Sequence, residues 1–479
     1  MHFNTVLAPV YWQLIEPREG SFDFDTVDGL IRGARAHHLR LVLLWFGSWK
    51  NSMSSYVPDW AKENPQRFPR AALPDGRSLE ILSALSRANL DADSTAFTAL
   101  MKHLRQFDSE QRTVIMVQVE NEVGMIPMAR DHSAAANAAF YSAVPSELTR
   151  HLSSHRSSLA PAILKAWHAH GSKSGADWPD TLGPGPMTDE SFTAWTEGHY
   201  TGEVAARGKS AYSLPMYVNA ALIRPGKSPG EYPSGGPLPH LFDIWHAAAP
   251  AIDFLSPDLY FSNFVAWAGR YARPDNPLFI PETGRASAAD MVANALYAYG
   301  QLNTMGFSVY APEFLPPDEA ATLARGYELI DQLTPLILAN QGTGRMIGIR
   351  APADFNGKVD LAPQQFTLGN YTFDVHFKKP APISIGAKGE AKIPGAHGGL
   401  IIQTGANEFL VAGTGMIITF GTRGGKAQAG IDSIWEGRFD DGVWVAGRNL
   451  NGDDDNQGRY LRMPAKQFTI RRVRLYTYQ

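Results

Sequence analysis

The chain has 479 residues, of which 44% are hydrophobic and 19% are charged. This hydrophobic share is ample for a folded core and excludes a chain that is disordered throughout. The net charge of −4 and the absence of a Lys/Arg block leave a nucleic-acid partner without an electrostatic basis. Because there is no cysteine, disulfides, zinc–thiolate sites and a cysteine nucleophile are excluded. No apolar run is long enough for a membrane helix, so we expect no membrane-spanning segment.

The first two thirds of the chain alternates short apolar runs with stretches of helical periodicity. The apolar runs are Asn4–Val10, Arg40–Trp45, Thr113–Val119, Leu214–Ala220, Ile252–Leu259, Pro277–Ile280 and Gly306–Tyr310. The predicted helices are Asp25–His37, Thr95–Phe107, Phe192–Arg207, Leu241–Ala249 and Ala288–Met305. This alternation is typical of βα units around a parallel sheet and predicts an α/β fold, a (β/α)8 TIM-type barrel. Because the runs number seven, the first strand of the barrel is counted as missing.

The composition changes near residue 339. From there to Gln479, short strand-like pieces alternate with glycine-rich turns, which predicts an all-β sandwich. We therefore predict two domains, a catalytic barrel of residues 1–338 and a β-sandwich of residues 339–479. The acidic run Asp453–Asp455 is interpreted as a solvated turn rather than a cation loop.

Polar side chains cluster at the end of the third apolar run. The strand Val114–Val119 is followed by Glu120, Asn121 and Glu122. In a TIM-type barrel, side chains at the carboxyl ends of the strands point into the active site. The alternative is an ordinary polar transition from strand to loop. Buried acids and amides are costly unless they are used, so we favour a site.

The sixth run also stops at a carboxylate, Glu282, followed by Gly284. A glutamate that caps the next helix would give the same pattern, so this signal is weak by itself. Together, Glu122 and Glu282 indicate a glycoside hydrolase, because glycoside hydrolysis uses two carboxyl groups. One is protonated and assists the leaving group, and the other attacks or activates water.

Three segments resemble glycoside hydrolase family 35, the β-galactosidases. Gln118-Val-Glu-Asn-Glu-Val-Gly124 is similar to that family's Q-V-E-N-E-Y-G. The stretch from Asn4 to Pro17, continued by Gly20-Ser-Phe-Asp-Phe24, is similar to its N-T-V…W-N-x-H-E-P…G-x-F-D-F. Phe279-Ile-Pro-Glu-Thr-Gly284 fits its nucleophile strand. The C-terminal module resembles the β-sandwich of a bacterial branch that includes enzymes removing galactose from xyloglucan fragments.

The resemblance implies catalytic roles for three residues. Glu122 would be the acid/base, Glu282 the nucleophile, and Asn121 would contact the sugar 2-hydroxyl. Retention of configuration needs the two carboxyl groups about 5–5.5 Å apart. Elsewhere the chain departs from the family, since Pro9 replaces a tyrosine and Asn51 falls about where a galactose-binding glutamate is usual.

We therefore predict a rebuilt sugar-binding shell of aromatic and polar residues near strand ends. Its members are Asn121, Trp45, Trp49, Lys50, Asn51, Tyr260, Trp12 and Tyr310, with Glu16 and Glu313 as further candidates. Tyr260 is expected to hydrogen-bond the nucleophile carboxylate. For each residue alone, packing or a loop salt bridge is the competing interpretation. The histidines show no metal-ligand spacing, so we predict no metal and no cofactor.

The leading hypothesis is a retaining exo-β-galactosidase that acts on plant-type oligosaccharides. The alternatives are a β-glycosidase of the same clan with another sugar specificity, and a non-catalytic carbohydrate-binding barrel. We also expect a further strand and helix before Met1, with a signal peptide as an open option. Localisation therefore stays open between the periplasm or exterior and the cytoplasm.

Overall fold

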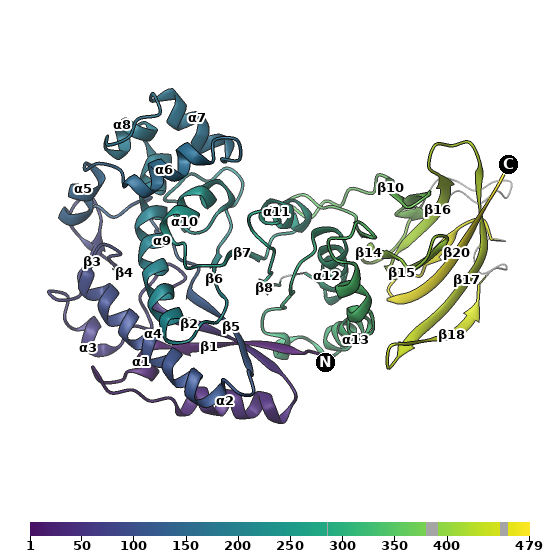
Figure 1. The fold of residues 1–479 in the computed structure, drawn as a ribbon, viewed down its shortest axis with the longest axis horizontal. Coiled ribbons are helices and arrows are strands. Elements are labelled where there is room, and N and C mark those ends of the chain that lie inside the picture. The colour runs from purple at the N-terminus through teal and green to yellow at the C-terminus, as the bar shows by residue number, and fades with distance from the viewer. Residues whose placement is uncertain (285, 380–390, 451–457) are drawn as a thin grey trace. The chain divides into compact units, whose positions relative to one another are not determined.

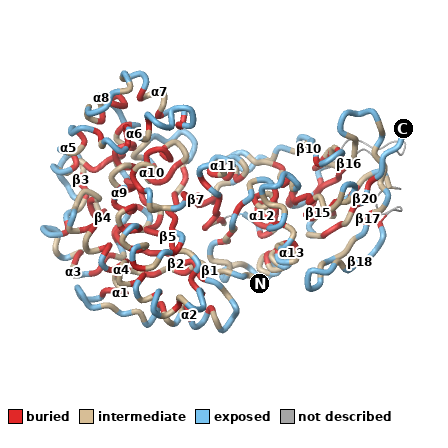
Figure 2. The backbone as a smooth tube through the Cα atoms, viewed as in Figure 1, coloured by how far each residue is buried: buried red, intermediate tan, exposed pale blue. Residues whose placement is uncertain are grey.

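The structure is a computed structural model that describes residues 1–284, 286–379, 391–450 and 458–479. Its contacts group the chain into two compact units, residues 4–258 and residues 1–3 with 259–479. Figure 1 traces both units, and Figure 2 shows that buried residues concentrate on their strands and on the inner faces of their helices. None of the described helices is long and apolar enough to cross a membrane. The acidic run Asp453–Asp455 lies outside the described residues.

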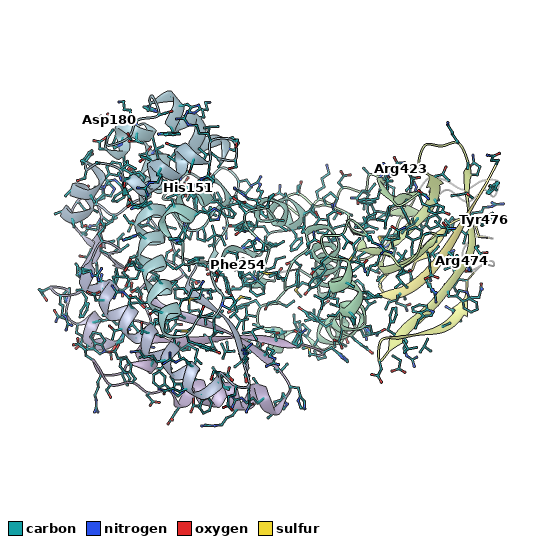
Figure 3. All side chains as sticks on the ribbon, viewed as in Figure 1. His151, Asp180, Phe254, Arg423, Arg474 and Tyr476 are labelled. Atoms are coloured by element: carbon teal, nitrogen blue, oxygen red, sulfur yellow. The ribbon has the colours of Figure 1, made fainter. Side chains whose placement is uncertain are left out.

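A parallel sheet forms the centre of residues 4–258. Its strands, in hydrogen-bonded order, are β1 (Thr5–Tyr11), β2 (Arg40–Lys50), β5 (Val114–Asn121), β6 (Met216–Ala220) and β7 (Phe254–Leu259). Parallel strands are covered on both faces, which is why they read as continuous apolar runs. Phe254, labelled in Figure 3, begins β7 and stacks on Tyr217 of β6 with ring centroids 5.4 Å apart.

Helices connect these strands. They are α1 (Trp12–Ile15), α2 (Asp25–Ala36), α3 (Asp59–Lys62), α4 (Arg87–Asp108), α5 (Ala134–Phe140), α6 (Ser146–Ser154), α7 (Pro161–Ala169), α8 (Trp178–Leu182), α9 (Pro186–Ala211), the 3-10 turn η1 (Pro239–Leu241) and α10 (Phe242–Ala248). A hairpin of β3 (Arg70–Ala72) and β4 (Ser78–Leu82) precedes α4. The alternation of parallel strands and helices agrees with the α/β class predicted from the sequence.

Two of the predicted strands are wrong in position. In the described part of the segments 277–280 and 306–310, Ile280 and Phe307 form a single parallel bridge, and strand β8 consists of Glu282–Thr283. Prolines at 277 and 281 explain the interruption, because proline has no N–H to donate to a ladder. The expected strand before Met1 stays a prediction.

The second unit begins with helices and continues as an all-β module. Its first elements are α11 (Phe264–Tyr271), β8, α12 (Ala288–Leu302), the 3-10 turn η2 (Pro312–Phe314) and α13 (Pro317–Asn340). The strands that follow are β9 (Met346–Arg350), β10 (Gln364–Leu368), β11 (Tyr371–His376), β12 (Lys378–Lys379), β13 (Ala391–Lys392), β14 (Gly398–Gln403), β15 (Glu408–Thr414), β16 (Met416–Thr422), β17 (Gln428–Asp440), β18 (Val443–Asn449), β19 (Leu461–Met463) and β20 (Thr469–Tyr478).

Two antiparallel sheets of this module enclose one apolar core. Their orders are β10-β11-β16-β19 and β18-β17-β20-β15-β14-β9. Side chains of both sheets meet in the core, among them Phe373 and Ile418 from one and Phe409 and Val473 from the other. This is the sandwich that the alternating sequence pattern predicts. The structure changes from helix to strand between Asn340 and Met346, whereas the domain boundary at residue 339 stays a prediction.

Helix α12 packs closely on β9. A Cβ on Gly300 would lie 2.9 Å from the Cα of Gly348, and one on Gly348 would lie 2.3 Å from the carbonyl oxygen of Tyr297. Partly buried Arg350 then donates to Asn294 at 2.8 Å and to Asp290 at 2.7 Å on the same helix. Paired glycines and one shared arginine therefore join the helix to the sandwich in one compact unit.

We predict that Gly348→Ala destabilises the protein by about 1–3 kcal/mol, the usual cost of overpacking. The added methyl meets backbone atoms, which cannot move aside as a side-chain tip can. The measurement is equilibrium unfolding in urea. Gly269→Ala is the matched control, because that glycine is exposed in helix α11 and nothing lies within 4 Å of an added Cβ. The control is expected to be neutral or stabilising, and equal losses in both variants would contradict the packing argument.

Candidate active site

The carboxyl end of β5 holds the polar residues that the sequence singled out. Gln118, Glu120 and Asn121 are fully buried. The backbone φ is 61° at Glu120 and 43° at Glu122, both in the left-handed region that L residues rarely adopt. Each such residue costs roughly 1–2 kcal/mol. Surrounding contacts must therefore hold this backbone in place.

Neighbouring strand ends hold the backbone of Glu122. Its N–H donates to Oδ1 of Asn219 at 2.9 Å, and Asn219 donates in turn to Asp258 at 2.6 Å. On the other side, Ser52 N–H donates to the carbonyl oxygen of Glu122 at 3.2 Å. Asn219 and Asp258 were missed by the sequence analysis. The usable signal was the one applied to Glu122, a polar residue at the end of an apolar run.

Three residues of the predicted sugar-binding shell lie together. Nζ of Lys50 donates to Oδ1 of Asn121 at 2.8 Å and also to Oδ1 of Asn51. The N–H of Asn51 donates to the carbonyl oxygen of Asn121 at 3.1 Å. The end of β2 therefore fixes both the main chain and the side chain of Asn121. Their contacts with a sugar stay predictions.

The predicted tryptophans are deeply buried. Trp12, Trp45 and Trp49 have exposed fractions of 0%, 0% and 1%. Their indole N–H groups donate to Glu16 at 2.9 Å, Asp93 at 2.9 Å and the carbonyl oxygen of Leu82 at 3.1 Å. Burial with a satisfied N–H is what packing alone requires of tryptophan. Packing accounts for all three rings in this structure, and their predicted sugar contacts stay untested.

A pair of buried carboxyl groups lies beneath the β5 end. Asp93 of α4 and Glu120 are both fully buried. Burial, followed by the charge of Asp93, raises the pKa of Glu120 well above its usual range. Tyr200 of α9 donates to Asp93 at 3.2 Å, and burial with the two carboxyl groups raises the pKa of its hydroxyl. The sequence pattern marked Glu120 but gave no reason to single out Asp93.

In the second unit, Tyr260 donates its hydroxyl proton to Oε2 of Glu282 at 2.7 Å. The predicted hydrogen bond between these two residues is therefore present. Tyr310 packs edge-on against Tyr260 with ring centroids 6.1 Å apart, and 62% of its surface is exposed. Its N–H donates to the carbonyl oxygen of Thr283 at 2.8 Å. Tyr260 and Tyr310 thus lie beside the predicted nucleophile.

The two predicted catalytic carboxylates belong to different compact units. Glu122 lies in residues 4–258 and Glu282 in residues 259–479. Their predicted separation of about 5–5.5 Å therefore stays a prediction.

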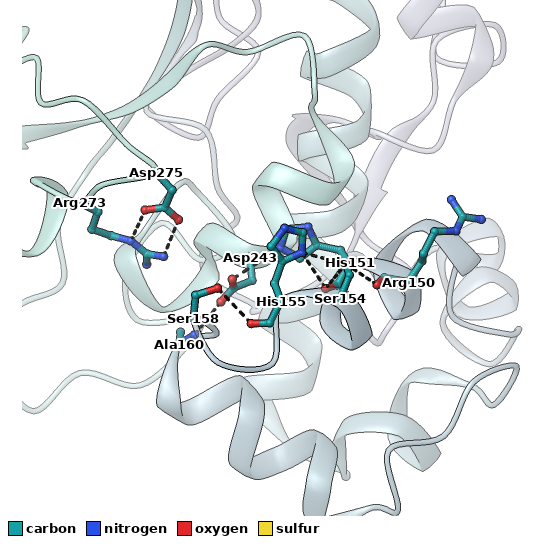
Figure 4. Close-up of polar contacts among 9 residues, drawn as sticks. All are labelled: Arg150, His151, Ser154, His155, Ser158, Ala160, Asp243, Arg273 and Asp275. Atoms are coloured by element: carbon teal, nitrogen blue, oxygen red, sulfur yellow. Dashed lines mark hydrogen bonds and ion pairs between the residues drawn. The ribbon is translucent and has the colours of Figure 1, made fainter.

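Two histidines of the first unit, His151 and His155, lie on helix α6 and at its end. His151 stacks on His155 with ring centroids 4.2 Å apart and lies 3.7 Å from Asp243 (Figure 4). Asp243 also accepts from the N–H of Ala160 at 2.8 Å, so it links α6, α10 and the start of α7. Across the described ranges, no three His, Asp or Glu side chains are grouped as a metal-binding set.

A small pocket beside the β3–β4 hairpin contains a second buried glutamate. Its mostly apolar lining includes Ile81, Leu82 and Met125, with Glu197 of α9 among its polar members. Burial raises the pKa of Glu197 well above its usual range. Among the described residues, no donor lies within hydrogen-bond distance of its Oε2.

Comparison with known families gives two matches on separate parts of the chain. Residues 1–195 match the glycoside hydrolase family 42 model, described as beta-galactosidase. Residues 323–462 match a domain of unknown function, DUF5597. The resemblance to family 35 in particular is not supported, because the family 42 model fits instead. The matched part includes Asn121 and Glu122 but not Glu282. A comparison with curated proteins found no significant match.

Among solved structures, the chain is similar to several β-galactosidases at low identity. That of psychrophilic Marinomonas ef1 is 12% identical with a TM-score of 0.46, covering 69% of this chain and 56% of the other. The β-galactosidase of the Antarctic haloarchaeon Halorubrum lacusprofundi is 16% identical with a TM-score of 0.44, covering 69% of this chain and 54% of the other. That of Bacillus circulans sp. alkalophilus is 15% identical with a TM-score of 0.45, covering 69% of this chain and 52% of the other. The chain thus spans little more than half the length of these proteins.

We predict that Glu197→Gln becomes more stable relative to the unchanged protein as pH rises. A glutamate with a raised folded-state pKa must take up a proton on folding. Its stability contribution is therefore lost progressively above the unfolded-state pKa of about 4.3. The difference in unfolding free energy between the variant and the unchanged protein is expected to change by about 1.4 kcal/mol per pH unit until the folded-state pKa is reached.

The measurement is urea unfolding of both proteins from pH 5 to 8. Glu110→Gln, in an exposed turn, is the control and is expected to show no such trend. A constant difference between the Glu197 variant and the unchanged protein would show that Glu197 folds in its charged form.

Proposed function

We propose that the chain is a retaining β-galactosidase that releases terminal β-D-galactose from oligosaccharides, with xyloglucan-type fragments as the substrate class. The observation that carries the proposal is the match of residues 1–195 to a β-galactosidase family model. That region includes the β5 end, where Asn121 and Glu122 are held by the neighbouring strand ends. The hydrogen bond from Tyr260 to Glu282 supports the proposed role of Glu282 as the second catalytic carboxylate.

The proposed reaction proceeds by two displacements at the anomeric carbon. Glu282 attacks as a carboxylate while Glu122, protonated, gives its proton to the departing glycosidic oxygen. The product of this step is a covalent galactosyl ester on Glu282. Glu122, now ionised, then takes a proton from water as the water attacks the anomeric carbon, and the anomeric C–O bond to Glu282 breaks. Two inversions restore the β configuration and return both carboxyl groups to their starting forms.

The surrounding contacts suit these roles. The hydroxyl of Tyr260 donates to Oε2 of Glu282, which orients the carboxylate. The backbone of Glu122 is bonded on both sides, to Asn219 and to Ser52, which limits the positions that its side chain can reach. Pre-positioned groups of this kind lower the barrier because orientation is fixed before the reaction.

Two other functions remain as alternatives. A β-glycosidase of the same clan would use the same carboxyl pair on another sugar, such as an arabinoside, glucoside or glucosaminide. A non-catalytic carbohydrate-binding protein would keep the fold without turnover. The departures at Pro9 and Asn51 favour neither alternative by themselves, since they alter the sugar shell and not the carboxyl pair.

A panel of aryl β-glycosides tests the proposal. We expect the galactoside to be cleaved with a kcat/KM at least about tenfold above the arabinoside, glucoside and glucosaminide, a preference that one or two sugar hydrogen bonds can supply. Cleavage of only another glycoside would replace the galactose assignment. Binding of galactose without cleavage of any glycoside would favour the non-catalytic alternative.

A nucleophile variant tests the mechanism. Glu282→Gly is expected to lower kcat at least roughly 10³-fold, because the covalent path is lost. Added azide should restore part of the rate and yield the α-galactosyl azide by direct displacement. Glu110→Gly, in an exposed turn, is the control for mutation at a glutamate. A Glu282 variant with the unchanged rate would remove Glu282 from this role.

A further inference from the structure

We infer that Asp93 and Glu120 share one proton, and that this proton positions the Asn121–Glu122 segment. The inference deepens the proposed function and rests on it for its catalytic part. Both residues are fully buried, so we assign them positioning roles. Their influence on Glu122 runs through the main chain of β5.

Three hydrogen-bond donors surround the carboxyl group of Asp93. Oδ1 accepts from the indole N–H of Trp45 at 2.9 Å. Oδ2 accepts from the N–H of Ser48 at 3.1 Å and from the hydroxyl of Tyr200 at 3.2 Å. Three donors on a fully buried carboxylate replace much of the water that it loses.

Glu120 lies close to this carboxylate and is less well supplied with donors. Its Oε2 accepts from the N–H of Trp49 at 2.7 Å. The position of a Cβ on Gly47 would lie 2.7 Å from Oε1 of Glu120 and 2.8 Å from Oδ1 of Asp93. Both carboxyl oxygens therefore border the same point, which is open only because residue 47 is glycine.

Two buried carboxyl groups this close cannot both be ionised, as in other carboxyl pairs that hold one proton between them. The distribution of donors places the proton on Glu120 and the charge on Asp93. The raised pKa of Glu120, which comes from burial and from the charge of Asp93, agrees with this assignment. Other titratable groups that face the pair are Tyr200 from α9 and Glu16 from the segment after α1, and neither is a cation.

The shared proton also holds a strained main chain. Glu120 has a φ of 61°, and its carbonyl oxygen accepts from Nε2 of Gln118 at 2.9 Å. Its side chain accepts from the N–H of Trp49 through Oε2, while Oε1 borders Asp93 at the point next to Gly47. Loss of the proton would set two negative charges against each other and free the backbone to leave the left-handed region. Asn121 and Glu122 follow directly in the chain and would move with it.

Two substitutions at Glu120 test the positioning role. Gln keeps an oxygen that accepts from Trp49 and an N–H that donates to Asp93, whereas Met fills a similar volume with neither. We expect Glu120→Met to lower kcat about 100-fold with KM changed less than about threefold, as for misplaced catalytic groups. The kcat of Glu120→Gln should be at least about tenfold higher than that of Glu120→Met. Equal kcat values for the two variants would overturn the positioning role.

A stability measurement tests the shared proton without using activity. Between pH 5 and 9, the ratio of unfolding constants for the unchanged protein and Glu120→Gln should change by about tenfold per pH unit while Glu120 holds its proton. When Asp93→Asn is present in both proteins, the same ratio of unfolding constants should change over this pH range by a factor at least about tenfold smaller. The charge that keeps the proton on Glu120 is then gone. Equal changes in the two backgrounds would overturn the shared proton.

Glu197→Gln is the matched control, since Glu197 is equally buried and its raised pKa has burial as its cause. Its pH trend should be the same in both backgrounds. If no glycoside is cleaved, the proposed function fails while the stability result still decides whether the proton is shared. If glycosides are cleaved but the pH dependence of stability is the same with and without Asp93→Asn, only the shared proton is contradicted.

Discussion

The end of β5 is the constraint on which the candidate site depends. Glu120 and Glu122 adopt left-handed backbone, which is unfavourable for both residues unless other contacts oppose its relaxation. Those contacts come from segments far apart in the sequence. Trp49 and Ser52 reach the strand end from one side and Asn219 from the other. The candidate site is thus built into the parallel sheet through contacts from both neighbouring strands.

Burial divides the predicted sugar shell into two kinds of residue. The indole rings of Trp45 and Trp49 are enclosed and their N–H groups bind within the protein, so they support the strand ends from behind. Lys50 and Asn51 gather at the side chain of Asn121, and Tyr260 orients Glu282. The second group consists of flexible or polar side chains, and their contacts with a sugar stay predictions.

In the second unit, a change in amino-acid composition along the chain does not coincide with the limit of a compact unit. The sandwich begins after Asn340 by its strand pattern, yet α12 packs on β9 through Gly300 and Gly348, and Arg350 ties the same two elements together. A glycine-to-glycine approach leaves little trace in composition, because it requires only that two distant residues lack side chains. The matches to two family models, on residues 1–195 and 323–462, lie on either side of this helix.

The sequence alone determined the alternation of strands and helices, the sandwich pattern, and the polar end of β5, because these follow from local periodicity and from one residue's neighbours in the chain. It also marked Tyr260 as a partner of Glu282, since both follow apolar runs. It misplaced strands around Pro277 and Pro281, because these two prolines have no N–H to donate to a ladder. Only the tertiary structure revealed Asp93, Asn219 and Asp258, because their roles depend on which strand ends and helices come together. Burial, which raises the pKa of Glu120 well above its usual range, is likewise a property of the assembled fold.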